Sequence, residues 1–141
     1  MTYMKRILAL TLTILPLLAA AQLSSTQTIV AQVPFEFVVG TRTIPAGECT
    51  VRWASDGRQI LMIHNAAAKA GLFASALTDE TRNASGQYAL VFHVVGGKYF
   101  LAAMQLANSR TIYRLPQSKA EAELLSQNMQ PTETILVASL R

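Results

Sequence analysis

Two adjacent glycines, Gly96 and Gly97, constrain the fold of this chain more than any other feature of its sequence. They separate two segments, 88–95 and 98–105, that are rich in apolar, aromatic and β-branched residues. A two-residue turn between antiparallel strands needs positive φ angles, which glycine adopts at little steric cost. The sequence therefore predicts a tight β-hairpin with these two segments as its strands.

The register of this hairpin follows from its two-residue turn. The predicted cross-strand pairs are Val94 with Tyr99, Phe92 with Leu101, Leu90 with Ala103 and, on the opposite face, His93 with Phe100. Both faces carry apolar side chains, a pattern typical of strands that are covered on both sides. We expect the hairpin to lie centrally in the fold.

Further short strands are predicted before and after the hairpin. Apolar residues at every second position from Val33 to Val39 share one face, and Pro34 places this stretch at a sheet edge or a bulge because it lacks a backbone donor. The other segments with strand character are 48–54, 59–64, 71–77, 110–115 and 134–140, with turns at 44–47 and 55–58 and an exposed polar loop at 78–86.

One helix is predicted in the C-terminal half of the chain. Ser118 and Glu121 have the spacing of a capping box, good helix formers follow, and Pro131 prevents continuation. About seven or eight short strands with one short α-helix, and without β-α-β alternation, indicate an all-β fold. The fold class is an antiparallel β-sandwich or a small β-barrel.

Residues 1–21 have the three parts of a bacterial secretory signal peptide. A basic pair, Lys5 and Arg6, precedes an apolar run that ends in three alanines. This run of about 15 residues is shorter than the roughly 20 that a membrane-spanning helix needs. We expect cleavage after Ala21, which leaves residues 22–141 as a single exported domain, periplasmic or secreted, without a stable membrane span.

The charge and cysteine content exclude some classes of function. Removal of Lys5 and Arg6 from the 12 basic residues leaves 10 against 8 acidic ones, a net charge of +2 without a basic cluster, so nucleic-acid binding is not expected. The single cysteine, Cys49, cannot form an internal disulfide. It alternates with Val51 and Trp53, which predicts a small buried side chain rather than a reactive thiol.

No constellation of catalytic or metal-binding residues is visible. His64 and His93 have no second ligand at metal-binding spacing, no G-x-S-x-G elbow occurs, and the carboxylates are scattered over turns, loop and helix. We therefore predict no catalytic, cofactor-binding or metal site, and no cofactor. Four aromatic residues could form a binding face, but we expect them to fill the core: Tyr88, Tyr99, Phe100 and Tyr113.

Four segments together resemble a family of small exported bacterial proteins of uncharacterised function. They are VPFEFVVG at 33–40, IPAG at 44–47, FH at 92–93 with GKYFL at 97–101, and LPQSKAEAEL at 115–124. The resemblance implies export and brings no catalytic residue with it. Cys49 stands where such sequences tend to carry an aromatic residue, so the resemblance gives no support to thiol chemistry.

Three hypotheses for function follow. The first is a non-enzymatic module that acts in envelope structure or binds an envelope protein. The alternative is a carrier of a small apolar ligand, with a cavity inside a barrel lined by the small residues Ala89, Ala102 and Ala103. A hydrolase of unrecognised type is the least favoured, because it needs converging polar groups that the sequence does not indicate.

Overall fold

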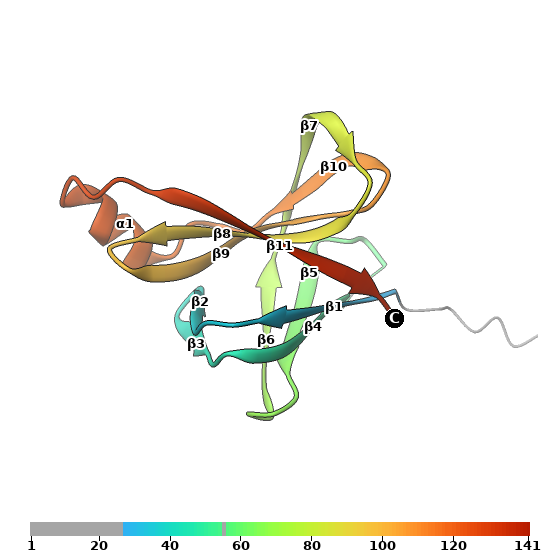
Figure 1. Cartoon of the computed structure of the whole chain (residues 1–141), viewed down its shortest axis with the longest axis horizontal. Helices are drawn as coiled ribbons and strands as arrows, with labels where there is room; N and C mark the ends of the chain where they lie inside the picture. The colour runs from blue at the N-terminus through green and yellow to red at the C-terminus, as the bar shows by residue number, and fades with distance from the viewer. Residues whose placement is uncertain (1–26, 55) are drawn as a thin grey trace, which may run out of the picture.

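Strands dominate the computed structural model, which describes residues 27–54 and 56–141 (Figure 1). Together they form an 11-stranded, nearly closed, barrel-like sheet with one short helix, so the predicted all-β class is confirmed. The predicted signal segment, residues 1–21, and Ser55 of the predicted turn lie outside the described residues. The elements are β1 Thr28–Val33, β2 Phe37–Val39, β3 Arg42–Ile44, β4 Gly47–Trp53, β5 Ile60–Asn65, β6 Ala70–Ser75, β7 Leu77–Ser85, β8 Tyr88–Val95, β9 Lys98–Gln105, β10 Ser109–Arg114, α1 Lys119–Ser126 and β11 Thr132–Leu140.

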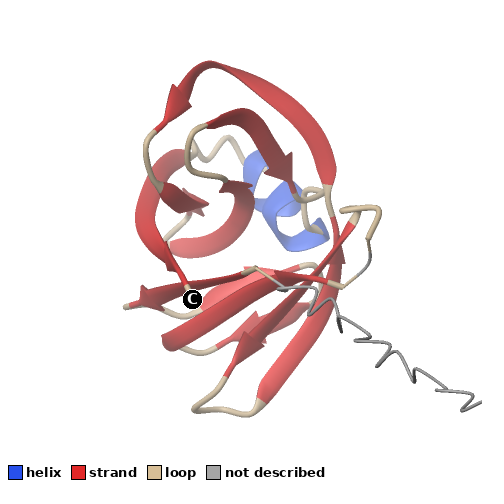
Figure 2. Ribbon diagram, turned by 90° about the vertical axis from the view of Figure 1, so that its right-hand side faces the viewer, coloured by secondary structure: helices blue, strands red, loops and turns tan. Residues whose placement is uncertain are grey.

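The sheet closes on itself through one bent length of chain. The hydrogen-bonded order is β3-β2-β9-β8-β11-β1-β4-β5-β6, and β10 pairs with both β9 and β7. Only Ala76 separates β6, which pairs with β5, from β7, which pairs with β10. The chain therefore passes directly from β6, at one end of this order, to β7, at the end of the branch that leaves the order at β9. In Figure 2 a lower layer of strands lies side by side and the remaining strands curve above it.

Strand β11 joins the two halves of the sheet. It pairs with β8 from Thr132 to Ala138, but it meets β1 at only two positions, where Ile29 faces Leu140 and Val30 faces Ser139. β1 pairs with β4 along its whole length. Strands β11 and β1 thus converge at one end and separate at the other, as Figure 1 shows.

The central hairpin forms where the sequence predicts it. Strands β8 and β9 have the predicted bounds, and Gly96 and Gly97 have φ angles of +57° and +76°. The three predicted pairs nearest the turn are confirmed. The fourth is wrong, because the register shifts between Val91 and Phe92, so that Leu90 faces Met104 instead of Ala103. Ala102 is the extra residue of this β-bulge on β9.

The structure has more strands than the seven or eight predicted from the sequence. The predicted polar loop at 78–86 is wrong for most of its length, because residues 77–85 form β7 and pair with β10. The alternating stretch from Val33 to Val39 is not one strand: it breaks after Val33 and resumes as β2 at Phe37. β3 was included in no predicted strand. These three differences account for the excess over the predicted seven or eight.

Bulky apolar side chains fill the interior of the sheet. The largest of them, with almost no exposure, are Phe37, Phe92, Ile44, Leu61, Ile63, Leu90 and Met104. Phe100 is equally buried but lies on the opposite face of the hairpin, where it pairs with His93. The rings of Phe35 and Phe37 both meet Phe92 edge to face, with centroids 5.0 and 5.2 Å apart. These ring contacts lie within one half of the sheet. The two halves meet where Trp53 of β4 packs edge to face on Tyr113 of β10, with centroids 4.4 Å apart, and in the core cluster that both halves share.

Helix α1 begins as the sequence predicts and then makes an unexpected contact. The Ser118 hydroxyl oxygen accepts a hydrogen bond from the Glu121 backbone N–H at 3.1 Å, which is the predicted N-cap. The Glu121 carboxylate, predicted to reach back to the cap, lies 2.8 Å from Nδ1 of His93 on β8. Glu121 is buried whereas the His93 side chain is 35% exposed. This contact fixes α1 against the central hairpin.

Candidate functional site

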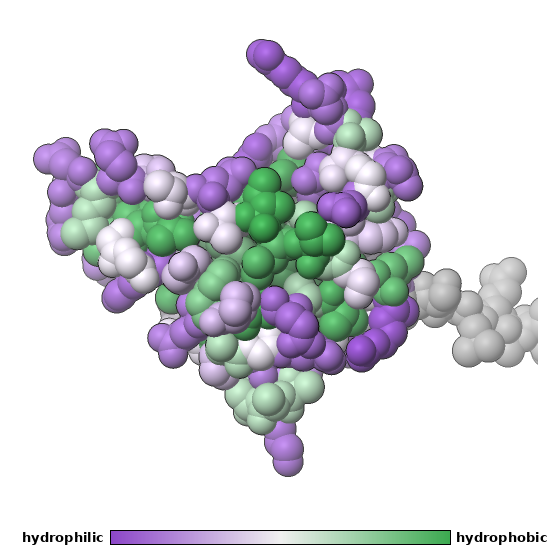
Figure 3. Space-filling view, in the orientation of Figure 1, coloured by the Kyte–Doolittle hydropathy of each residue, from purple (hydrophilic) through white to green (hydrophobic). Residues whose placement is uncertain are grey.

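An apolar band lies on the outer face of the sheet where β11 pairs with β8. We call it the outer apolar strip and define it by Val91, Ile112, Ile135 and Val137. Ile135 and Val137 are 56% and 59% exposed. Ile135 pairs with Val91, and Val91 packs with Ile112 and Ala103 in a small cluster separate from the main core. Figure 3 shows apolar side chains gathered at the middle of this face.

The strip exists because the centre of β11 is apolar on both faces. Leu136 and Ala138 face the main core, whereas Ile135 and Val137 point to the opposite side because successive residues of a strand alternate. Polar residues, Glu133 and Ser139, flank the two exposed side chains on the outer face. A sheet face in contact with water is normally polar, so the strip departs from that pattern.

Sequence reasoning missed this strip. It identified the β11 segment only as a closing strand. The sequence does contain an indication of the strip. Ile135 to Val137 are three consecutive apolar residues, and such a run gives a strand two apolar faces. The exposure of one face depends on which elements cover it, and that arrangement is a property of the fold rather than of the local sequence.

Cys49 lies in the core, as predicted. Its side chain has no exposed surface, and it shares the inner face of β4 with Val51 and Trp53. Burial raises the pKa of the Cys49 thiol above its ordinary value, the nearby charge of Glu48 acts in the same direction, and the Asn65 amide opposes both. The thiol form is therefore favoured, and the thiolate needed for nucleophilic chemistry is disfavoured.

Asn65 is the buried polar residue beside this thiol. Its amide nitrogen donates to the Pro45 carbonyl oxygen at 2.8 Å, and its amide oxygen accepts from the Ala68 backbone N–H at 3.0 Å. These bonds connect the turn before β4 to the turn after β5. The arrangement satisfies the amide and serves packing, since a buried polar group without partners would cost stability.

The two histidines lie on different parts of the sheet. His64 on β5 faces outward beside Thr50 and Arg52, and it is adjacent in sequence to Asn65, whose side chain points to the core. His93 is paired with Glu121. The fold does not bring either imidazole to Cys49. Within residues 27–54 and 56–141 there is no group of three or more His, Cys, Asp or Glu side chains that could hold a metal ion.

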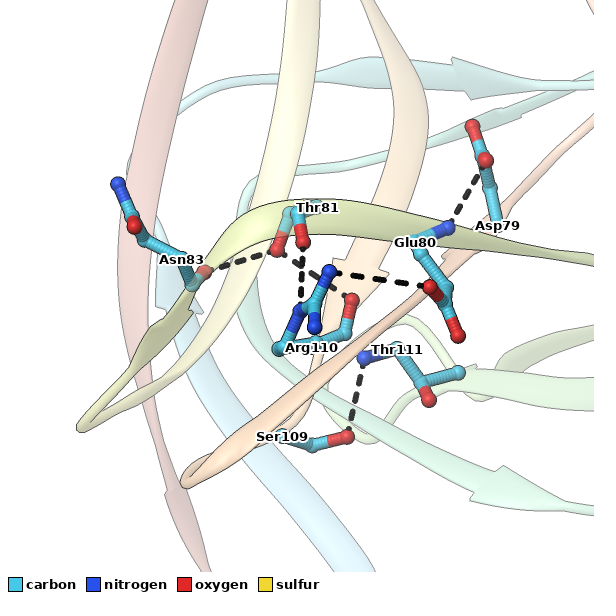
Figure 4. A network of polar contacts seen from close by, with 7 residues as sticks. All are labelled: Asp79, Glu80, Thr81, Asn83, Ser109, Arg110 and Thr111. Carbon is cyan, nitrogen blue, oxygen red and sulfur yellow. Dashed lines mark hydrogen bonds and ion pairs between the residues drawn. The ribbon is translucent and has the colours of Figure 1, made fainter.

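Strands β7 and β10 form an arm whose side chains are mainly polar and exposed. Figure 4 shows the polar contacts along it. Arg110 donates from Nε to the Thr81 carbonyl oxygen at 3.2 Å, and the Thr81 hydroxyl reaches the carbonyl oxygens of Asn83 and Arg110. Nearer the barrel, Arg114 and Asp79 form an ion pair of 2.7 Å. Most of these contacts join a side chain of the arm to one of its backbone carbonyl oxygens, so they serve the pairing of β7 with β10.

The four aromatic residues weighed as a binding face contribute to the core, as predicted. Phe100 and Tyr113 are buried, and Tyr88 and Tyr99 are partly buried against the main cluster. Tyr99 stacks on Phe35 with ring centroids 3.7 Å apart. The three alanines considered as cavity lining, Ala89, Ala102 and Ala103, are all buried.

Comparison with known proteins adds no further assignment. None of the known family models, curated proteins or solved structures matches the chain significantly. In the part of the chain that the structure describes, no helix has the length and apolar character to cross a membrane. The all-β, barrel-like class is therefore defined by the fold itself.

Proposed function

We propose that this protein is a non-enzymatic, exported module that works by binding a protein of the bacterial envelope. The observation that carries the proposal is the outer apolar strip, in which Ile135 and Val137 are more than half exposed. Exposed apolar side chains that adjoin a buried cluster and have polar neighbours are a common feature of protein interaction sites.

The energetics support a binding role for the strip. Covering an exposed isoleucine or valine stabilises a contact by roughly 25 cal/mol per Å² of apolar surface removed from water. Val91 and Ile112 already pack beneath this surface, so a partner would contact apolar side chains held on paired strands rather than a mobile loop. Rigid anchors of this kind lose little side-chain entropy when a complex forms.

The filled interior favours the interaction module over the apolar-ligand carrier. Phe37, Leu61 and Phe92 occupy the interior with other bulky side chains of the main core cluster. Of the three alanines considered as cavity lining, Ala103 does not face this interior, because it lies against Val91 and Ile112 on the outer side of the sheet. A carrier would need the packed side chains of the main core to move apart and open a space.

Export is the part of the proposal that rests on residues 1–21. The basic start, short apolar run and small residues before Gln22 support it. Mass spectrometry of the protein from the extracytoplasmic fraction should give an N-terminus at Gln22. An N-terminus at Met1 or Met4 would contradict cleavage and favour a retained anchor.

The binding role is tested by photo-crosslinking in living cells. A photoreactive phenylalanine placed at Val137 should give a discrete adduct with one envelope protein. Ile135→Glu in the same chain should abolish the adduct, because it places a charge in the centre of the contact.

Ile60 provides the matched control for this experiment. It is 41% exposed on β5, away from the strip, so Ile60→Glu makes the same kind of change elsewhere. The adduct from position 137 should survive this substitution. A second chain carries the photoreactive phenylalanine at Ile60 in place of Val137. The same adduct from both probe positions, or the lack of any adduct at 137, would overturn the proposal.

A further inference from the structure

The second edge of β6 has no partner strand. Within the described residues β6 pairs with β5 alone and ends the hydrogen-bonded order of the sheet. Natural sheets usually protect such an edge with a charged side chain, a proline or a bulge. The sequence of β6, AGLFAS, contains no charged residue and no proline, and its register with β5 is unbroken from Ala70 to Ser75.

The hydrogen-bond pattern identifies the free backbone groups on this edge. The Ala76 backbone N–H donates to the Gln59 carbonyl oxygen at 2.7 Å, so these two residues form a hydrogen-bonded pair at the end of the β5–β6 ladder. Such pairs alternate along an antiparallel ladder. The N–H and C=O groups of Gly71, Phe73 and Ser75 therefore point away from β5, toward the open edge.

A hollow of about 340 Å³ adjoins this edge. Leu72 and Ala74 of β6 line one side, and the other side is formed by the β2–β3 turn with Arg42 and by the segment 115–117 that precedes α1. The lining is mainly apolar, and Arg42 is its one charged residue among the described ones. Phe73 stands beside the edge on the outer face and is 69% exposed.

We propose that the β6 edge binds an extended peptide segment of a partner protein, with an acidic side chain of that segment beside Arg42. The bound strand would pair with the free groups of Gly71, Phe73 and Ser75, which is the mode of recognition by strand addition. Every second side chain of the bound strand would enter the hollow. The side chains between them would lie on the outer face and pack against Phe73. This inference rests on the proposed function, because it names a kind of partner, but it concerns a site separate from the outer apolar strip.

The surroundings of β6 favour a single strand over the sheet of a second copy. A second copy that paired through its own β6 would extend the sheet outward from this edge. The β2–β3 turn and the segment 115–117 stand on that side of the hollow. A lone peptide needs only the width of one strand, about 4.8 Å from β6. The charge of Arg42 further selects an acidic segment over a basic one.

The test uses the fluorescein-labelled hexapeptide Ser-Val-Ser-Asp-Ser-Val with the purified protein. In an extended strand its two valines and its aspartate share one face, so that they can enter the hollow and meet Arg42 together. Fluorescence anisotropy should show saturable binding, and NMR spectra should show the largest amide shifts at Gly71, Phe73 and Ser75. The same peptide with lysine for aspartate should bind about twofold to fivefold more weakly, as expected for loss of an exposed ion pair. A peptide methylated on alternate backbone nitrogens should bind at least about tenfold more weakly, because it cannot complete the ladder.

Two variants of Phe73 separate the backbone from the side chain. Phe73→Pro removes the outward N–H without breaking the β5 ladder, a position where an edge strand tolerates proline. Phe73→Ala removes the same ring but keeps the N–H, so binding should survive in Phe73→Ala and fall at least about tenfold in Phe73→Pro. Arg42→Gln should abolish the preference for aspartate over lysine.

Three results would overturn the inference. They are equal binding of the methylated and unmethylated peptides, amide shifts confined to the outer apolar strip, and a concentration-dependent dimer abolished by Phe73→Pro in the absence of peptide binding. Because the peptide readouts at β6 do not depend on Ile135, failure here leaves the crosslinking test of the strip intact. Failure at the strip likewise leaves the β6 measurements interpretable.

Discussion

The β8–β9 hairpin and the β7–β10 arm are both antiparallel ladders, yet different forces hold them. The hairpin is largely buried on both faces: Leu90 and Phe92 face the main core, and Phe100 is buried on the opposite face. In the arm, β7 is exposed along most of its length. Its side chains interact mainly through ion pairs and hydrogen bonds near solvent, such as Arg114 with Asp79.

The comparison shows that burial is not needed for a segment to become a strand. β10 is positioned by its pairing with β9, where Ile112 faces Gln105, and this pairing leaves its second edge available. β7 adds to that edge through backbone hydrogen bonds. We infer that the arm depends on the hairpin for its conformation, whereas the hairpin has its own apolar contacts.

The largest expected effect comes from removing an aromatic ring in the hairpin. Phe92→Ala should lower the free energy of unfolding by about 3–5 kcal/mol, because the ring is fully buried and leaves a cavity. Leu77→Ala in the arm, where the side chain is 67% exposed, should change it by about 0.5 kcal/mol or less. Urea denaturation followed by circular dichroism measures both. Similar losses in the two variants would contradict the distinction between hairpin and arm.

A smaller effect is expected where the hairpin meets α1. Glu121→Ala should cost about 1–3 kcal/mol, because it removes the buried carboxylate that contacts His93 at 2.8 Å. Glu123→Ala on the same helix provides the control, since its side chain is exposed. Urea denaturation of both variants gives the comparison. If the two substitutions cost the same, helix propensity rather than the His93 contact holds α1 in place.

The smallest effect is expected in the arm and depends on pH. The hydrogen bond from Arg114 lowers the pKa of Asp79, and the Glu80 backbone N–H acts in the same direction. A carboxyl group with a lowered folded-state pKa stabilises the fold above its unfolded pKa, and this contribution is lost as pH falls through the folded value.

Asp79→Asn should therefore lower the urea midpoint slightly at pH 7 and leave it unchanged at a pH below the folded-state pKa. Asp56→Asn, an exposed substitution in the turn after β4, is the control. The measurement is a series of urea titrations from pH 7 downward. A loss for Asp79→Asn that persists unchanged at the acidic end would show that the ion pair is not its cause.

The contrast between hairpin and arm also explains how much the sequence could predict. Gly96, Gly97 and the apolar runs beside them specified both hairpin strands to the residue. The bulge at Ala102 was not predictable, because it adjusts the hairpin to a curvature that arises only when the barrel-like sheet closes. β7 was missed because its polar side chains carry no apolar periodicity.

The candidate sites follow the same division. Burial of Cys49 could be predicted from its alternation with Val51 and Trp53. The exposure of Ile135 and the free edge of β6 could not, since each depends on which distant elements lie alongside. The local sequence specifies which face of a strand is apolar, but only the assembled sheet decides whether that face or edge is covered.

The position of β11 between β8 and β1 has a consequence for biogenesis. Ile29 of β1 pairs with Leu140 of β11, so these two neighbouring strands are separated in sequence by almost the whole described chain. A nascent polypeptide that has been made only as far as α1 exposes the adjoining edges of β8 and β1. Contacts so distant in sequence form slowly, and open edges invite wrong pairing. We therefore expect the insertion of β11 to be a late and slow step of folding, and the edges of β8 and β1 to stay open to wrong pairing until it is complete.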